Sequence, residues 1–196
     1  MDIEIKRLSP ALLEDYLRLF DTTPHDDGID AHKCYCVCWS SADAQGVDDS
    51  TPERRRALAI EYVTHRALDG YLAYCDGRVI GWCNANAKKD CLLSKCGRLY
   101  LRPSDPDAAP DPANVKSVFC FVIAPEMRRK GVASRLLERV CVDAAEEGFD
   151  VVEAYPVKTF ISPQADYMGP ARLYEKHGFT PYFDYGDRLI VRKACR

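Results

Sequence analysis

The sequence predicts an α/β protein built on one mixed β-sheet with helices on its faces. Three observations carry this prediction. Apolar and polar residues alternate at the two-residue period of strands in several separate segments. Other segments repeat apolar residues at helical spacing. The two kinds of segment are interleaved along the chain, and this order favours helices packed on a sheet.

The N-terminal part predicts a strand followed by two helices. Residues 3–8 alternate apolar and polar side chains, as an opening strand does. Ser9 and Pro10 then predict a helix start, because serine is a good N-cap and proline suits the first helical position. We expect the second helix to span residues 51–68 and to end at Gly70.

A hairpin, a polar loop and a buried strand follow. Asp76-Gly77, a favoured type I′ turn pair, separates two apolar runs and predicts a hairpin. Residues 88–114 have the composition of a long surface loop. Val115–Ile123 predicts the longest and most central strand, because both of its faces are apolar. Strict alternation would put Val118, Cys120 and Val122 on one face and Phe119, Phe121 and Ile123 on the other.

The C-terminal part predicts two more helices and three more strands. An apolar stripe over residues 132–147 predicts a helix that Gly148 ends. A strand is expected at 151–155, a short helix at 170–177 and a final hairpin within 180–192. We expect residues 1–196 to form a single domain, since a chain of 196 residues is of ordinary domain size.

Composition narrows the class of protein. Apolar residues make up 47% and charged residues 29%, and the net charge is -3. We therefore expect a globular protein that does not bind nucleic acid, which normally needs a basic face. The sequence shows no apolar run of membrane-spanning length and no secretory signal pattern, so we expect a cytoplasmic protein without membrane association. The ten cysteines are then expected to be reduced thiols.

A cationic turn carries the clearest chemical signal. Arg128, Arg129 and Lys130 follow the buried strand and precede Gly131, where a helix begins. The first turn of a helix offers unpaired N–H groups and the positive end of a dipole, and glycine lets an anion approach the backbone. Cations would oppose the helix dipole unless an anion binds there. The turn therefore predicts a phosphate or pyrophosphate site.

The chain resembles the GNAT N-acetyltransferases in two motifs. The pattern Arg-x-x-Gly-x-Ala, formed by Arg128, Gly131 and Ala133, is similar to the pyrophosphate loop with which this family binds acyl-CoA. The run Leu-Tyr-Glu-Lys-His-Gly-Phe at residues 173–179 is similar to the family's late helix. The resemblance covers residues 115–193. Tyr167 departs from it, because many members carry asparagine at that position.

The resemblance implies a GNAT-like fold and an acetyl-CoA-dependent reaction. The sheet would be mixed, mostly antiparallel and twisted, and splayed at its central strands. An amine would attack the thioester directly, without a metal and without a covalent enzyme intermediate. A backbone N–H near Phe121 or Val122 would polarise the thioester oxygen, and Tyr174 would protonate the leaving thiolate. The residues that would bind acetyl-CoA are Phe121, Val122, Ile123, Arg128, Arg129, Lys130, Gly131, Val132, Ala133 and Ser134.

Candidates for the base and for the acceptor site come from residue type and position. Glu153, in the middle of a strand beside the expected thioester, is the candidate general base, and packing or hydrogen bonding within the sheet is the alternative. Irregular residues 21–50 and 156–168 would form the acceptor wall. Aromatic side chains suit an apolar or cationic acceptor. The candidate substrate-binding residues are Tyr35, Trp39, Tyr155 and Tyr167.

Alternatives remain open at several points. His32, Cys34, Cys36 and Cys38 alternate, so a strand would put them on one face, as a pocket wall or as zinc ligands. Extended backbone spreads such ligands too far apart for the usual zinc knuckle, so we expect no metal. A non-catalytic acyl-CoA-binding module and a zinc–cysteine interaction module are the competing functions. The acceptor is a small-molecule or peptide amine, and a homodimer is left open.

Overall fold

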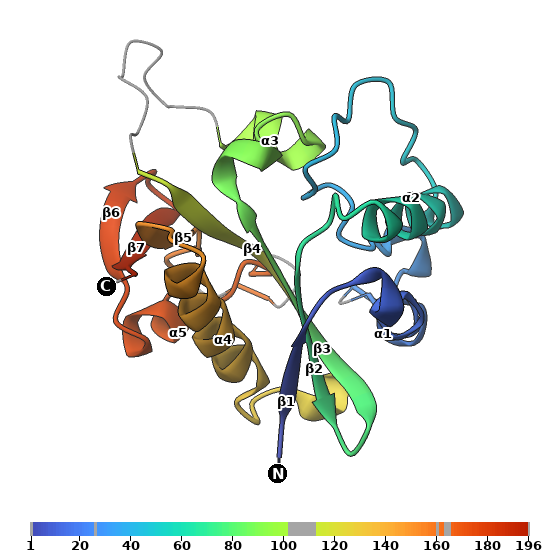
Figure 1. The fold of residues 1–196 in the computed structure, drawn as a ribbon, viewed down its shortest axis with the longest axis horizontal. Helices are drawn as coiled ribbons and strands as arrows, with labels where there is room; N and C mark the ends of the chain where they lie inside the picture. Colours follow the sequence, from blue (N-terminus) through green and yellow to red (C-terminus); the bar gives the residue numbers. More distant parts are fainter. Residues whose placement is uncertain (1, 26, 102–112, 160, 163–165, 196) are drawn as a thin grey trace.

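The computed structural model describes residues 2–25, 27–101, 113–159, 161–162 and 166–195. The strands are β1 (Glu4–Arg7), β2 (Gly70–Cys75), β3 (Arg78–Ala87), β4 (Val115–Ile123), β5 (Val151–Ala154), β6 (Thr180–Asp184) and β7 (Leu189–Ala194). They form one seven-stranded sheet in the order β1-β2-β3-β4-β5-β7-β6 (Figure 1). Only the β4–β5 pair is parallel, which confirms the mixed, mostly antiparallel sheet.

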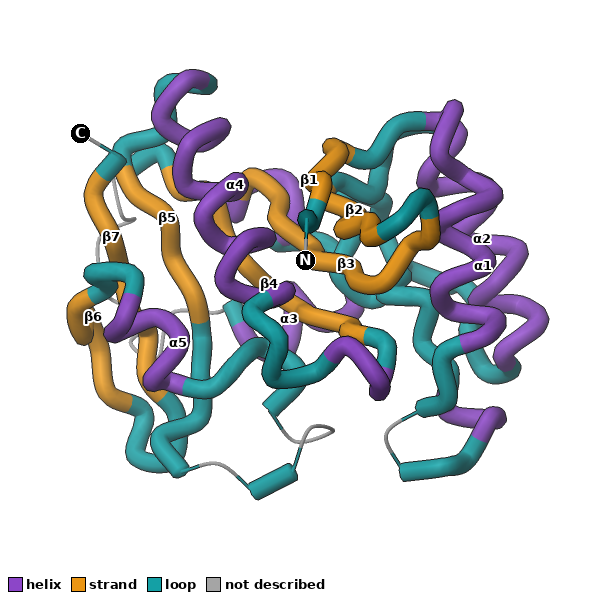
Figure 2. The backbone as a smooth tube through the Cα atoms, turned by 90° about the horizontal axis from the view of Figure 1, so that it is seen from below, coloured by secondary structure: helices purple, strands orange, loops and turns teal. Residues whose placement is uncertain are grey.

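Helices cover both faces of this sheet. They are α1 (Leu13–Thr22), α2 (Pro52–Thr64), α3 (Lys95–Tyr100), α4 (Val132–Glu146) and α5 (Ala171–Lys176). In Figures 1 and 2, α1 and α2 lie on one side of the central strands, and α4 and α5 lie on the other. Each side has its own hydrophobic core, one around α1 and α2 and one around α4.

The local sequence explains most of these boundaries. The side chain of Thr51 caps α2 by accepting a hydrogen bond from the amide of Arg54. The β2–β3 hairpin turns at Asp76 and Gly77, which both have the positive φ angles that a type I′ turn needs. Gly148 ends α4 in the left-handed conformation, at φ 78°. These three predictions are confirmed.

Some predicted boundaries are wrong. A 3-10 turn at Pro10–Leu12 precedes α1, and the Ser9 side chain makes no capping hydrogen bond. Helix α2 ends at Thr64, and Gly70 is the first residue of β2 rather than a helix cap. The expected polar loop contains α3, while its proline-rich residues 102–112 lie outside the described residues.

Strand β4 is central, as predicted, but two of its expected features are corrected. Strand β3 has ten residues and β4 has nine, so β4 is not the longest. Asn84 of β3 pairs with Cys120 while Ala85 pairs with Val118, so Phe119 is the extra residue of a β-bulge. The bulge breaks the alternation. Phe119, Cys120 and Val122 face α1 and α2, whereas Val118, Phe121 and Ile123 face α4.

The parallel pairing of β4 with β5 is short. It runs from Val115–Val151 to Val118–Ala154 and stops at the bulge. Beyond it, residues 119–123 have no strand partner on the β5 side among the described residues. The expected splay of these strands stays a prediction, and the length of the pairing is compatible with it.

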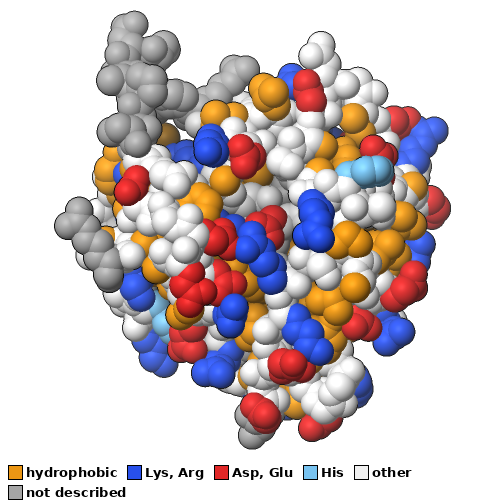
Figure 3. Space-filling model, viewed as in Figure 1, with side chains coloured by type: hydrophobic (Ala, Val, Ile, Leu, Met, Phe, Trp, Pro, Cys, Tyr) orange, Lys and Arg blue, Asp and Glu red, His pale blue; other side chains and the backbone are white. Residues whose placement is uncertain are grey.

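No helix in the described ranges is long and apolar enough to cross a bilayer. On the face shown in Figure 3, basic and acidic side chains are interspersed rather than gathered into one area of a single sign.

Candidate active site

The cationic turn lies where the sequence places it, between β4 and α4. A 3-10 turn at Pro125–Met127 follows the strand, and the Arg128 guanidinium donates a 3.2 Å hydrogen bond from Nε to the carbonyl oxygen of Ile123. Gly131 is the N-cap of α4 at φ 85°, a left-handed conformation that favours glycine. No heavy atom lies within 4 Å of a Cβ built on Gly131, so the space in front of the helix start is open.

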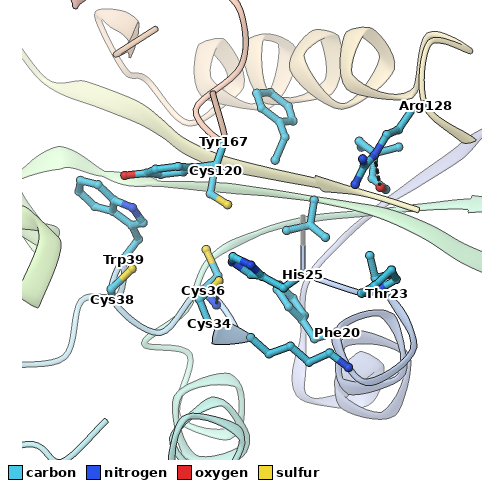
Figure 4. Close-up of a pocket in the computed structure, with 15 residues that line it drawn as sticks. Phe20, Thr23, His25, Cys34, Cys36, Cys38, Trp39, Cys120, Arg128 and Tyr167 are labelled. Carbon is cyan, nitrogen blue, oxygen red and sulfur yellow. Dashed lines mark hydrogen bonds between the residues drawn. The ribbon is translucent and has the colours of Figure 1, made fainter. Parts of the chain in front are cut away.

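A cavity of about 350 Å³ begins at this turn and runs along β4. Arg128 and the β4 residues 120–123 form one wall, and residues from the stretch 20–39 form the opposite wall. Figure 4 shows Arg128 at one end, Trp39 and Cys38 at the other, and Cys34, Cys36 and His25 between them. Tyr167 also lines the cavity. The cavity thus joins the predicted phosphate site to the segment predicted to hold the acceptor.

Residues 34–39, which we call the cysteine segment, form turns rather than the strand that alternation predicted. Tyr35 and Cys36 both have left-handed backbone conformations, at φ 46° and φ 53°. Non-glycine residues rarely adopt this conformation, and adjacent ones mark a backbone that its surroundings hold in place. This turn directs Cys34, Cys36 and Cys38 into the cavity wall, where Cys120 of β4 joins them.

The Cys36 sulfur accepts a hydrogen bond within the cavity wall. The amide Nδ2 of Asn84 donates to Cys36 Sγ over 3.3 Å, and the same NH2 group donates to the carbonyl of Trp39 over 2.8 Å. Burial acts to raise the pKa of the Cys36 thiol, but the neighbouring polar groups of Cys120, Trp82 and Asn84 outweigh burial and lower it. The neighbouring Cys34 has its pKa raised to about 12, mainly by burial. Cys36 is therefore the cavity thiol with the greatest thiolate character.

His25 belongs to a compact polar group beside the cavity. Its Nδ1 lies 2.6 Å from Asp27 Oδ1, and His32 Nδ1 lies 2.6 Å from Asp27 Oδ2. His25 lines the cavity and His32 does not. This trio is the only set of potential metal ligands in the described part of the chain whose ligand atoms lie within 4.8 Å of one another. The cysteine segment does not provide such a set.

The predicted aromatic residues divide between cavity and core. Trp39 and Tyr167 line the cavity, and Trp39 stacks on Phe119 with 4.2 Å between ring centroids. Tyr35 lies in the core instead, where its hydroxyl donates to Asp21 over 2.7 Å. Tyr155 stacks on the far side of Phe119 and is buried behind it. Tyr35 and Tyr155 therefore do not line this cavity.

Glu153 is held inside an ion-pair network. The side chain is fully buried, and Lys88 Nζ and Arg192 Nε each lie 2.6 Å from its carboxylate. The Tyr155 hydroxyl donates to it over 2.6 Å. Two cations and one hydroxyl thus occupy the carboxylate, and Glu153 does not line the cavity. This placement argues against the predicted base role.

Two predicted donors are occupied by neighbouring carbonyls. The amide of Phe121 donates to the carbonyl of Tyr167 over 2.7 Å. The hydroxyl of Tyr174, a fully buried side chain, donates to the next carbonyl, that of Met168. Successive amides of a strand point to opposite sides, so the amide of Val122 faces its β3 partner Trp82. The structure therefore leaves neither predicted backbone donor exposed.

The comparisons with known proteins agree with this fold. A family model described as "Acetyltransferase (GNAT) domain" matches residues 67–181, more than half of the chain. A search of curated proteins finds no match. Among solved structures, an N-acetyltransferase from Staphylococcus aureus Mu50 is similar, with 15% identity, 100% of each chain covered and a TM-score of 0.56.

Two further solved structures have the same fold. The PaiA N-acetyltransferase from Thermoplasma acidophilum, in complex with coenzyme A, has 16% identity, 99% of each chain covered and a TM-score of 0.51. The polyamine N-acetyltransferase of Drosophila melanogaster has 12% identity, 97% of each chain covered and a TM-score of 0.55. Together with the family match, the cationic helix start and the mixed sheet identify this chain as a member of the GNAT acetyltransferase family.

Proposed function

We propose that residues 1–196 form one acetyltransferase domain that transfers an acetyl group from acetyl-CoA to a primary amine by direct attack. The observation that carries this proposal is the continuous cavity from Arg128 to Trp39. One end lies at Arg128, three residues before the N-cap of α4, and the other lies in the cysteine segment. A cofactor with an anionic end and a reactive end needs both features in one space.

The start of α4 supplies the site for the CoA pyrophosphate. The N–H groups of the first turn, from Val132 to Ser134, have no helical acceptor of their own and suit phosphate oxygens. Gly131 leaves the approach open, while Arg128, Arg129 and Lys130 add positive charge. The pantetheine arm would then follow β4 from Ile123 toward Phe121. The absence of a strand partner beyond Val118, among the described residues, supports this path.

Acetyl-CoA would replace two protein carbonyls when it binds. The thioester oxygen takes the place of the Tyr167 carbonyl on the amide of Phe121, and the CoA sulfur takes the place of the Met168 carbonyl on Tyr174. The amine nitrogen then forms a bond to the thioester carbon and loses a proton. The carbon–sulfur bond breaks, and the Tyr174 hydroxyl protonates the departing thiolate.

The cavity favours an acceptor with an apolar body and one amino group. Its charged lining residues are the cations Lys33 and Arg128, and no aspartate or glutamate lines it among the described residues. A second positive charge on the acceptor would meet repulsion there without a compensating carboxylate. Trp39, Phe20 and the thiols provide apolar contact area instead. We therefore favour the apolar acceptor over the cationic one.

An amine screen tests this function. Purified protein is incubated with acetyl-CoA and either phenylethylamine or spermidine, and both CoA release and the acetylated amine are measured. We expect phenylethylamine to be acetylated and spermidine to be acetylated at least tenfold more slowly. A tenfold difference in rate corresponds to about 1.4 kcal/mol in activation free energy. Faster acetylation of spermidine would overturn the acceptor class. Tight CoA binding without transfer to any amine would favour the acyl-CoA-binding module.

A further inference from the structure

The proposed reaction needs a group that removes a proton from the amine. An alkylamine has a pKa near that of lysine, about 10.4, so at neutral pH it enters the cavity mostly as an ammonium ion that cannot attack. Glu153 is engaged by Lys88 and Arg192 and lies outside the cavity. No aspartate or glutamate is among the described residues that line the cavity. A different proton acceptor must therefore reach this space.

His25 has the position and the support that such a group needs. It lines the cavity, while its Nδ1 lies 2.6 Å from Oδ1 of Asp27, a residue that does not line the cavity. No described residue hydrogen-bonds to the other ring nitrogen, Nε2. A histidine that donates Nδ1–H to a carboxylate presents the lone pair of Nε2, and the carboxylate stabilises the imidazolium that forms when Nε2 takes a proton.

Asp27 is itself fixed in place. Its Oδ1 also accepts a 2.9 Å hydrogen bond from the amide of Ile29, and its Oδ2 faces His32 Nδ1 at 2.6 Å. The hydrogen bond with His32, followed by those from Ile29 and His25, lowers the pKa of Asp27 well below its ordinary value. The carboxylate is therefore ionised at neutral pH and cannot rotate away from His25 without losing contacts on both oxygens.

A metal ion bound by the same three residues is the competing explanation. Two ligands of a tetrahedral zinc ion with bonds of about 2.0 Å lie roughly 3.3 Å apart. Both imidazole nitrogens lie only 2.6 Å from the Asp27 oxygens, a distance that a shared proton explains and a shared metal does not. The geometry therefore favours hydrogen-bonded pairs.

We propose that His25 is the general base of the reaction and that Asp27 is its positioning residue. This inference rests on the proposed acetyl transfer. His25 Nε2 takes one proton from the ammonium nitrogen before the nitrogen–carbon bond forms, the Asp27 carboxylate holds the resulting imidazolium, and this proton leaves to water after the acetylated product departs. Tyr174 gives its proton to the CoA thiolate as the carbon–sulfur bond breaks. The second proton of the nitrogen, which is released as the amide forms, returns to the Tyr174 oxygen.

The test compares three variants with phenylethylamine and acetyl-CoA as substrates. His25→Gln keeps a polar side chain but removes the proton acceptor, so kcat should fall about 100-fold while the KM for acetyl-CoA stays unchanged. Asp27→Asn should lower kcat about tenfold and move the acidic limb of the pH profile to lower pH. His32→Gln is the matched control, because His32 touches the same carboxylate but lies outside the cavity.

The pH profile separates His25 from the other groups that share its space. Lys33, Arg128, Tyr167 and the thiols of Cys34, Cys36, Cys38 and Cys120 line the same cavity, and Asp27 and His32 lie behind the ring. In the wild type, the kcat/KM for phenylethylamine should fall at acidic pH. In His25→Gln this acidic limb should move to higher pH, toward the pKa of the amine itself, while it should keep its position in Cys36→Ser and in His32→Gln.

Chemical rescue keeps the proposal testable if a variant is unstable. His25→Ala leaves space for free imidazole, which should restore activity in proportion to its concentration. An unchanged kcat and pH profile in His25→Gln would overturn the base assignment and leave the proposed function intact. If a chelator abolishes the wild-type activity and zinc restores it, a metal site would replace His25 as the explanation for the activity. If the wild type acetylates no amine, the proposed function and this inference fall together.

Discussion

The carbonyl oxygen of Tyr167 lies 2.7 Å from the amide nitrogen of Phe121, on the edge of β4 that β5 leaves uncovered. The next carbonyl, that of Met168, accepts the hydroxyl of Tyr174. Two consecutive carbonyls thus occupy the two donors that a thioester would use for its oxygen and its sulfur. In the proposed reaction, binding of acetyl-CoA would replace the carbonyl oxygens of Tyr167 and Met168 with the oxygen and the sulfur of the thioester.

Tyr174→Phe tests the second of these donors. The ring is retained, so its edge-to-face packing on Phe179 should survive. Loss of the hydroxyl leaves the buried carbonyl of Met168 without its donor, which should cost about 1–3 kcal/mol in the free energy of unfolding. The acid role further predicts that kcat falls at least tenfold, about 1.4 kcal/mol, with less change in CoA affinity. A variant that is destabilised but turns over normally would assign Tyr174 to packing alone.

Gly131→Asp tests the pyrophosphate site, with Gly148→Asp as a matched control. Both glycines have left-handed backbones, at φ 85° and φ 78°, and both have open space where a Cβ would lie. The two variants therefore carry similar backbone strain at opposite ends of α4. Only the aspartate at position 131 would face the CoA phosphates, so we expect its Kd for CoA to rise at least tenfold, about 1.4 kcal/mol. Equal Kd values for both variants in calorimetry would contradict this site.

Glu153→Gln should reduce stability rather than chemistry. The substitution removes the negative charge of a fully buried side chain that pairs with the partly buried Lys88 and Arg192, and breaking a buried pair in this way costs about 3–5 kcal/mol. Urea unfolding should show this loss. Glu138→Gln, which weakens an exposed 3.4 Å contact with Arg135 and a 4.0 Å contact with His177, should change stability by less than about 0.5 kcal/mol. A large fall in kcat per folded molecule of Glu153→Gln would restore Glu153 as a catalytic candidate.

Cys36 should be the most reactive thiol of the cavity. Hydrogen bonds to its sulfur lower its pKa against the effect of burial, whereas the pKa values of Cys34, Cys38 and Cys120 are raised. Because the thiolate is the nucleophile, iodoacetamide at neutral pH should label Cys36 first among these four, as followed by peptide mass spectrometry. Asn84→Ala removes one of the donors and should slow the labelling. Equal labelling of Cys34 and Cys36 would contradict the lowered pKa.

Periodicity and turn chemistry were enough to predict most of the fold. The Asp76-Gly77 turn, the Gly148 helix end and the central β4 strand all rest on local rules, and the structure follows them. The bulge at Phe119 could not be predicted in this way. Both faces of β4 are apolar, so an extra residue leaves the pattern of apolar positions unchanged.

The active site was harder to predict because distant segments build it. The alternating cysteines have the spacing of a strand, and the residue types do not predict the left-handed backbone conformations of Tyr35 and Cys36. The sequence makes Glu153 a candidate base because it does not show that Lys88 and Arg192, from two other parts of the chain, contact its carboxylate in the fold. For His25, the pattern His-x-Asp was the available signal, but only the folded chain shows that His25 lines the cavity and Asp27 does not.

The bulge in β4 makes the composition of the cavity wall depend on the number of residues in this strand. If Phe119 instead paired regularly with Asn84, every later residue of β4 would shift by one position along β3 and change faces. Cys120 and Val122 would then face α4, while Phe121 and Ile123 would fill the cavity. Exchange of one apolar side chain for another should be tolerated along this strand, whereas a single insertion or deletion after Phe119 would exchange the residues that face the cavity for those that face α4. Relatives that diverge freely in sequence here should therefore keep the same strand length.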